Sequence, residues 1–202
     1  MEIEAKFQLT SHYSIRQRIL ELGGRSLAGR YLERNTRLDT HDRALARSHR
    51  LLRVRQGPRN LLTVKQGTET FETRHEYEIE IDDCEAGLEL LQALGYEKTV
   101  IYEKYREIYA LNSVSLMLDE LPYGPFVEIE GPALGRVRDA AETLGLDWEK
   151  RVRRSYIAIF NRLQEAIGFQ FSDATFSNFA GIEPIPPELL QRAISGGLRE
   201  AE

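Results

Sequence analysis

The chain has 202 residues, 42% hydrophobic and 29% charged, which is typical of one globular domain, alone or with an appendage. Its formal net charge of −5 argues against a uniformly basic nucleic-acid-binding surface but allows a local basic cleft. The single cysteine, Cys84, excludes an internal disulfide and a cysteine-based zinc site. No apolar run reaches the roughly 20 residues needed to span a bilayer, and the acidic N-terminus does not resemble a signal peptide. We therefore expect a cytoplasmic protein without a membrane partner.

Periodicity predicts about eight strands and four or five helices. In chain order, we expect a strand over 1–9, a helix over 11–22, an extended segment over 26–39, a hairpin over 50–65, a strand over 71–81, a helix over 85–94, strands over 97–111, 114–121 and 126–129, and helices over 134–144 and 148–167. Short links join most neighbouring strands, so the sheet is expected to be mainly antiparallel.

Charged residues recur at every second position on the predicted strands. In the first strand, alternation places Glu2, Glu4 and Lys6 on one face and Ile3 and Phe7 on the other. The acids in such positions are Glu2, Glu4, Glu76, Glu78, Asp119, Glu128 and Glu130, and the bases are Lys6, Arg53, Arg55, Lys65, Arg74, Lys104 and Arg106.

Two arrangements can explain these stripes. In any single strand, a solvated face above a core face would suffice. Taken together, the charged doublets favour strands whose charged faces point inward and whose apolar faces are covered by helices. About eight strands can close around a lumen the size of a small ligand.

A lumen with both signs of charge suits phosphate chemistry. Mg²⁺ or Mn²⁺ is bound by carboxylates together with phosphate oxygens and water, while arginine and lysine bind the phosphate oxygens themselves. No Gly-x-x-x-x-Gly-Lys occurs, which argues against a P-loop nucleotide hydrolase.

The same residues resemble the CYTH superfamily, the triphosphate tunnel metalloenzymes, over about residues 1–165. The resemblance rests on an ordered series of motifs: Glu2-Ile3-Glu4-Ala5-Lys6, Leu51-Leu52-Arg53-Val54-Arg55, Thr63-Val64-Lys65, Arg74-His75-Glu76-Tyr77-Glu78, Lys104-Tyr105-Arg106, Asp119, Phe126-Val127-Glu128-Ile129-Glu130 and Ser155-Tyr156. It implies an α+β fold, a closed eight-stranded antiparallel β-barrel with helices packed outside.

The resemblance also implies roles for the charged residues. Metal ions, Mg²⁺ or Mn²⁺, would be held by Glu2, Glu4, Asp119, Glu128 and Glu130. The triphosphate would be bound by Lys6, Arg53, Arg55, Lys65, Arg74, Lys104 and Arg106. Glu76 and Glu78 would place a second metal or the attacking water, and Tyr31 could transfer a proton.

Members of the superfamily hydrolyse inorganic triphosphate, thiamine triphosphate or RNA 5′-triphosphate ends, or cyclise ATP. We expect a metal-dependent hydrolase of a small-molecule triphosphate, and the alternatives are a class IV type adenylate cyclase, a thiamine triphosphatase and a non-catalytic polyphosphate-binding module. Arg37-Leu38-Asp39-Thr40 lacks the tyrosine typical of thiamine triphosphatases, which puts that alternative in doubt. Nucleic acid is not an expected partner, and a homodimer and the identity of the triphosphate stay open.

Two stretches fall outside the motif series. Lys150, Arg151, Arg153 and Arg154 form a basic run that is either a solvated face or part of a tunnel mouth. We assign residues 166–202 to a C-terminal extension without regular structure, which its phenylalanines would dock on the barrel or the tunnel mouth.

Overall fold

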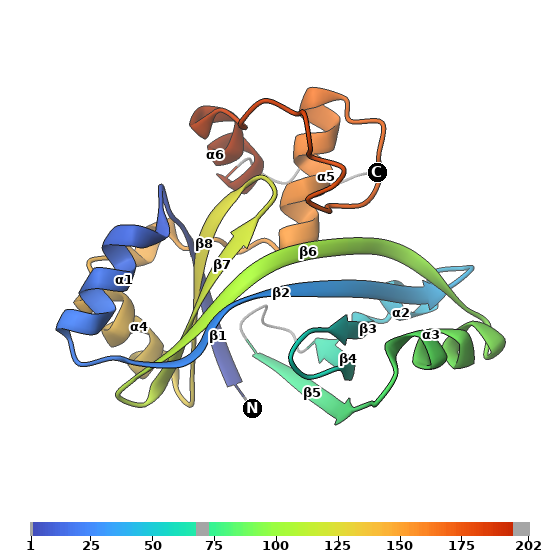
Figure 1. Cartoon of the computed structure of the whole chain (residues 1–202), viewed down its shortest axis with the longest axis horizontal. Coiled ribbons are helices and arrows are strands. Elements are labelled where there is room, and N and C mark those ends of the chain that lie inside the picture. Colours follow the sequence, from blue (N-terminus) through green and yellow to red (C-terminus); the bar gives the residue numbers. More distant parts are fainter. Residues whose placement is uncertain (1, 68–72, 196–202) are drawn as a thin grey trace.

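A computed structural model describes residues 2–67 and 73–195, without the side chains of Glu2, Thr73 and Arg74. These residues form an α+β fold with eight strands, six α-helices and one 3₁₀ turn (Figure 1). The strands are β1 (Glu2–Gln8), β2 (Arg25–Thr40), β3 (Arg50–Gln56), β4 (Leu61–Gly67), β5 (Thr73–Glu80), β6 (Tyr96–Leu111), β7 (Val114–Leu121) and β8 (Gly124–Gly131). The helices are α1 (His12–Glu21), α2 (Ala44–Arg47), α3 (Cys84–Ala93), α4 (Leu134–Thr143), α5 (Tyr156–Ile167) and α6 (Pro187–Ser195), with the 3₁₀ turn at Trp148–Lys150.

The strands form one curved antiparallel sheet in the order β5-β4-β3-β2-β6-β7-β8-β1. Its outer strands meet at one short place, where Glu2 lies opposite Arg74 and Ile3 opposite Thr73. Among the described residues, these two residue pairs are the whole of the β1–β5 pairing. The prediction of an α+β fold with eight antiparallel strands is therefore confirmed, whereas complete closure into a barrel is not.

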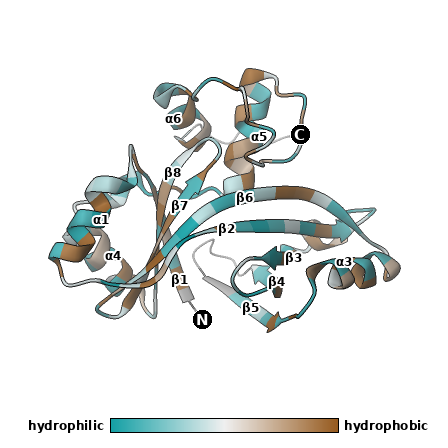
Figure 2. Ribbon diagram, viewed as in Figure 1, coloured by the Kyte–Doolittle hydropathy of each residue, from teal (hydrophilic) through white to brown (hydrophobic). Residues whose placement is uncertain are grey.

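The outer face of the sheet carries the apolar core. Helices α1 and α4 bury Ile19 and Val137 against Leu116 and Ile129 of the β7–β8 region. Helix α3 packs on β3 through a second hydrophobic cluster, and α5 covers a third. The hydrophobic segments of both helices are brown in Figure 2. These layers turn the opposite face of the sheet, with its charged doublets, toward the interior.

One predicted apolar face has no such cover among the described residues. Tyr77 and Ile79 of β5 point outward as alternation requires, but their exposed fractions are 65% and 60%. The expectation that helices cover the outer face therefore holds for β1, β3, β7 and β8 but not for β5.

The single helix predicted over 148–167 is wrong in its first half. After the 3₁₀ turn, residues 151–155 are not helical, and the Val152 N–H donates to the Lys6 carbonyl at 2.7 Å. Helix α5 begins only at Tyr156, where the Ser155 hydroxyl accepts a hydrogen bond from Ala158 N. It ends at Gly168, whose φ of 82° suits the left-handed conformation of a helix end.

The C-terminal extension is also more regular than predicted, because it contains α6. Phe169, Phe171 and Phe179 gather around Phe160 of α5, with ring centroids 6.2–6.5 Å from that ring. Helix α6 follows and packs against α5 (Figure 1). None of the described helices is long and apolar enough to cross a membrane.

Candidate functional site

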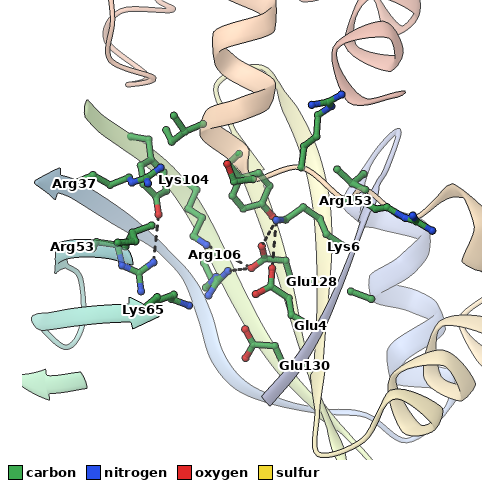
Figure 3. Close-up of a pocket in the computed structure, with 18 of the residues that line it drawn as sticks. Glu4, Lys6, Arg37, Arg53, Lys65, Lys104, Arg106, Glu128, Glu130 and Arg153 are labelled. Atoms are coloured by element: carbon green, nitrogen blue, oxygen red, sulfur yellow. Dashed lines mark hydrogen bonds and ion pairs between the residues drawn. The ribbon is translucent and has the colours of Figure 1, made fainter. Parts of the chain in front are cut away.

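A cavity of about 510 Å³ lies against the inner, charged face of the sheet. Nine of the predicted site residues line it: Glu4, Lys6, Arg53, Arg55, Lys65, Lys104, Arg106, Glu128 and Glu130. Figure 3 shows the basic residues Arg53 and Lys65 on one side and Glu4 and Glu130 on the other. Period-two alternation brings these side chains together from five different strands, β1, β3, β4, β6 and β8.

The basic side of the cavity contains buried donors that lack acceptors. Arg53 is 6% exposed, and its Nε and Nη2 have no hydrogen-bond partner in the described structure. The Nε of Arg55 also has no hydrogen-bond partner in the described structure, although it lies 3.5 Å from Glu33 Oε1. Buried guanidinium N–H groups normally donate hydrogen bonds. This wall therefore offers free donors to an anion with several acceptor oxygens.

On the acidic side, carboxylates face one another across β1 and β8. Glu4 lies opposite Glu130, and Lys6 lies opposite Glu128. Lys6 Nζ is 3.0 Å from Glu128 and 3.5 Å from Glu4. Burial favours the neutral amine of Lys6, but Glu128 and Glu4 outweigh burial and raise its pKa. Lys6 is therefore a fixed cation beside a carboxylate pair.

The Glu4–Glu130 pair fits a divalent metal. Like charges directly opposite each other on neighbouring strands are destabilising unless a cation lies between them, and Mg²⁺ typically takes one or two carboxylates plus phosphate oxygens and water. Within the described side chains, no group of three His, Cys, Asp or Glu residues is close enough to form a metal centre. Glu2, on the same face of β1, and Arg74 were also predicted in the site, but both side chains lie outside the described structure.

Asp119 is placed differently from the other predicted metal ligands. It is fully buried, does not line the cavity and receives two hydrogen bonds of 2.6 Å from Arg106. Lys104 Nζ donates to Asp119 at 3.0 Å and the Tyr156 hydroxyl at 2.9 Å. In this structure Asp119 orients two bases of the site, and its role as a metal ligand stays a prediction.

Glu33 of β2 is a buried acid that the sequence interpretation missed. It is fully buried, 3.6 Å from Lys104, and Asn35 donates to it at 3.0 Å. Burial opposes its ionisation, but Lys104, Arg106 and Arg55 outweigh burial and hold the pKa of Glu33 well below its usual range. Glu33 follows Tyr31 by two positions on the same strand face, which was the available signal.

The predicted catalytic residues lie near the cavity but not in its lining. Glu76 is 2.8 Å from Lys65, and Glu78 accepts a hydrogen bond from Thr63 at 3.0 Å. Burial raises the pKa of the Tyr31 hydroxyl, with a further contribution from Glu33. Their catalytic assignments stay predictions.

Two aromatic residues and four further arginines also line the cavity. Tyr102 and Tyr156 are buried in its wall, and the Lys6 ammonium lies 4.1 Å from the centre of the Tyr156 ring. Burial opposes ionisation of Tyr102, but Arg53 and Lys104 outweigh burial and lower the pKa of its hydroxyl. The lining arginines outside the motif series are Arg37, Arg151, Arg153 and Arg154, so part of the basic run does reach the cavity.

Comparison with known proteins gives one consistent picture. Residues 1–156 match the model of the CYTH domain family. A candidate adenylate cyclase from Methanocaldococcus jannaschii is 22% identical over 172 residues, which cover 79% of this chain and 98% of that protein. The matched family domain ends at the first residue of α5, so the C-terminal extension lies beyond it.

Solved structures share the fold. A candidate adenylate cyclase from Vibrio parahaemolyticus has a TM-score of 0.72 at 21% identity, covering 79% of this chain and 97% of that one. A protein from Pyrococcus horikoshii has a TM-score of 0.68 at 29% identity, with coverages of 77% and 97%. A Hippeastrum protein described as a candidate adenylyl cyclase with a dominant triphosphatase activity has a TM-score of 0.59 at 20% identity, with coverages of 80% and 95%.

Proposed function

Since the chain belongs to the CYTH domain family, we propose that it is a divalent-metal-dependent hydrolase of a triphosphate substrate. The observation that carries this proposal is the arrangement of the cavity. Buried donors of Arg53 and Arg55 that have no acceptor among the described residues occupy one wall, and the opposed carboxylates Glu4 and Glu130 occupy the other. A metal-bound polyphosphate offers acceptor oxygens to the first wall and a cation to the second.

Closure of the sheet into a tunnel belongs to the same proposal. The outer strands already meet where Glu2 lies opposite Arg74. A bound substrate would interact with bases from β3, β4 and β6 and, through its metal, with acids from β1 and β8. These contacts would hold the two halves of the curved sheet around the substrate.

In this proposal, each group of residues in the cavity has a distinct role. Arg53, Arg55 and Lys65 bind the phosphate oxygens and fix the chain of phosphates in the cavity. Asp119 and Glu33 hold Lys104 and Arg106 in position for the same purpose. Glu4 and Glu130 would hold Mg²⁺ or Mn²⁺, which when bound neutralises phosphate charge and makes a coordinated water more acidic. Phosphoryl transfer depends mainly on such positioning and charge stabilisation.

A class IV type adenylate cyclase is the second candidate, because the relative from Methanocaldococcus jannaschii carries that description over 98% of its length. Hydrolysis remains the first candidate, because the Hippeastrum protein of the same fold is described as having a dominant triphosphatase activity. The two activities give different products. A hydrolase releases inorganic phosphate, whereas a cyclase converts ATP to cyclic AMP and pyrophosphate.

Incubation of the full chain with tripolyphosphate or with ATP, each with Mg²⁺ or Mn²⁺ between pH 7 and 10, tests the proposal. We expect metal-dependent release of phosphate and no cyclic AMP by chromatography. Cyclic AMP with pyrophosphate as the main products from ATP would favour the cyclase. Tight tripolyphosphate binding without turnover of either substrate would favour a non-catalytic binding module.

A further inference from the structure

The C-terminal extension pairs with β6 on both sides of Tyr102. Strand β7 pairs with β6 only from Tyr105 onward, which leaves the preceding edge of β6 available. At this edge the Ala174 N–H donates to the Ile101 carbonyl at 2.9 Å, and the Glu103 N–H donates to the Ala174 carbonyl at 3.0 Å. The extension therefore adds a short parallel bridge to the strand that carries Tyr102.

Side chains strengthen this bridge. The Ile101 N–H donates to Asp173 Oδ1 at 2.7 Å, and the Phe176 N–H donates to Glu103 Oε2 at 3.0 Å. The Phe176 ring contacts the Tyr105 ring, with centroids 4.9 Å apart. Residues 173–176 thus fix the backbone of β6 immediately before and after Tyr102.

The Tyr102 hydroxyl lies in the wall of the substrate cavity with an unused donor. The residue is 8% exposed, and its hydroxyl accepts a long hydrogen bond of 3.4 Å from Arg53 Nη1. Among the described residues, this hydroxyl donates to no acceptor. Buried hydroxyl groups usually satisfy their donor, and the space beside Arg53 is the cavity itself.

We propose that Tyr102 is a further substrate-binding residue, whose hydroxyl donates to a non-bridging phosphate oxygen beside Arg53, and that residues 173–176 hold it in position. This inference rests on the proposed function, because it requires a polyphosphate in the cavity. Part of the substrate site is then supported by a segment beyond the matched family domain. A hydroxyl that serves packing alone would affect stability but not affinity.

The variant Tyr102→Phe tests the hydroxyl, since it removes one oxygen and keeps the ring. Calorimetry with tripolyphosphate and a chelator, so that no turnover occurs, measures affinity directly. We expect about tenfold weaker binding or more, the usual effect of a lost hydrogen bond to a charged group, and a similar loss of kcat/KM when Mg²⁺ is present. Thermal unfolding of each variant verifies that it is folded.

Tyr109→Phe is the matched control. Tyr109 is a buried tyrosine on the same strand, and its hydroxyl donates to Glu107 at 2.9 Å in the core under α1, away from the cavity. Its variant should bind tripolyphosphate as the wild type does. Equal affinity of Tyr102→Phe and the wild type would overturn the inference while leaving the proposed function intact. Neither binding nor hydrolysis of tripolyphosphate by the wild type would overturn both.

A double-mutant cycle tests the role of the extension. Asp173→Ala removes the acceptor of the Ile101 N–H, and we expect a several-fold loss of affinity in the wild-type background but almost none in Tyr102→Phe. Gln170→Ala, in an exposed part of the extension, should leave the affinity unchanged in both backgrounds. If Asp173→Ala has the same effect in both backgrounds, or no effect in either, the extension does not act through Tyr102.

Discussion

At the scale of single residues, Arg53 connects the basic wall of the cavity with its aromatic wall. Its guanidinium reaches Tyr102 at 3.4 Å and Glu76 at 3.7 Å, yet two of its buried nitrogens lack hydrogen bonds within the described structure. A planar guanidinium can donate to two phosphate oxygens at once, which a lysine ammonium cannot do in the same geometry.

Arg53→Lys should therefore weaken tripolyphosphate binding about 10- to 100-fold while keeping the positive charge. Calorimetry in the presence of a chelator measures the dissociation constant without turnover. Arg59→Lys is the control, because Arg59 is an exposed guanidinium paired with Glu80 at 2.9 Å on the β3–β4 hairpin. A loss of affinity that is the same in both variants would show that Arg53 has no special contact with the substrate.

Residues of the site were predictable where charge itself alternates along a strand. Arg53 and Arg55, or Glu128 and Glu130, must share a face because strand side chains repeat every two residues. Glu33 could not be recognised in this way, because its neighbour Arg34 is also charged and forms an outward ion pair with Glu103. For such a residue, the charge pattern does not distinguish the buried charge from the surface charge, and the position two residues after Tyr31 was the signal that the sequence contained.

At the scale of elements, Asp39 of the stretch Arg37-Leu38-Asp39-Thr40 has a structural role at the start of α2. Its carboxylate accepts hydrogen bonds from the backbone N–H groups of Thr40, Leu45 and Ala46 at 2.8–3.0 Å, which satisfies the start of α2. Burial opposes ionisation of Asp39, but these backbone donors outweigh burial and lower its pKa.

Asp39→Ala should reduce the free energy of unfolding at pH 7 by about 1–3 kcal/mol, because it leaves three N–H groups without their acceptor. Urea denaturation followed by circular dichroism gives this value. Asp139→Ala, on the exposed face of α4, is the comparison and should change stability by less than about 0.5 kcal/mol. Equal stability of the Asp39 variant and the wild type would contradict the capping role.

Helix boundaries were less predictable than strand faces. Residues 151–155 have a helix-compatible composition, but the hydrogen bond from Val152 N to Lys6 O holds them in a non-helical conformation along the cavity. This long-range contact outweighs a weak local propensity. For α6 a local signal did exist, since Pro187 occupies the first helical position, which proline favours.

At the scale of the whole molecule, the charged interior links stability to pH. The pKa values of Glu33 and Glu128 lie well below their usual range, because burial is outweighed by neighbouring cations, chiefly Lys104 for Glu33 and Lys6 for Glu128. Both carboxylates stay ionised in the folded protein while the unfolded chain takes up protons near pH 4.3. Their stabilising contribution is therefore present above that pH and lost as the pH falls further.

The free energy of unfolding should accordingly decrease as the pH is lowered from about 5 to 2.5. In Glu33→Gln this slope should be smaller by up to about 1.4 kcal/mol per pH unit, the value for one proton. Glu89→Gln, at an exposed position of α3, should leave the slope unchanged. Urea titrations across this pH range measure the slope. An unchanged slope in Glu33→Gln would show that Glu33 does not contribute to the pH dependence of stability.

The arrangement of the whole chain was predictable as far as short links and alternation determine it. Eight antiparallel strands with a charged inner face follow from these patterns. The pairing of Ala174 with the edge of β6 does not, because it joins residues 72 positions apart without a charge pattern.

The most direct test of the central claim is the release of phosphate from tripolyphosphate by the wild type and by Glu130→Gln, each with and without Mg²⁺ or Mn²⁺. We expect turnover by the wild type only with metal. We also expect at least a 100-fold loss in the variant, because its carboxylate faces Glu4 across the proposed metal position. Metal-independent turnover by the wild type, or wild-type turnover by the folded variant, would contradict the account.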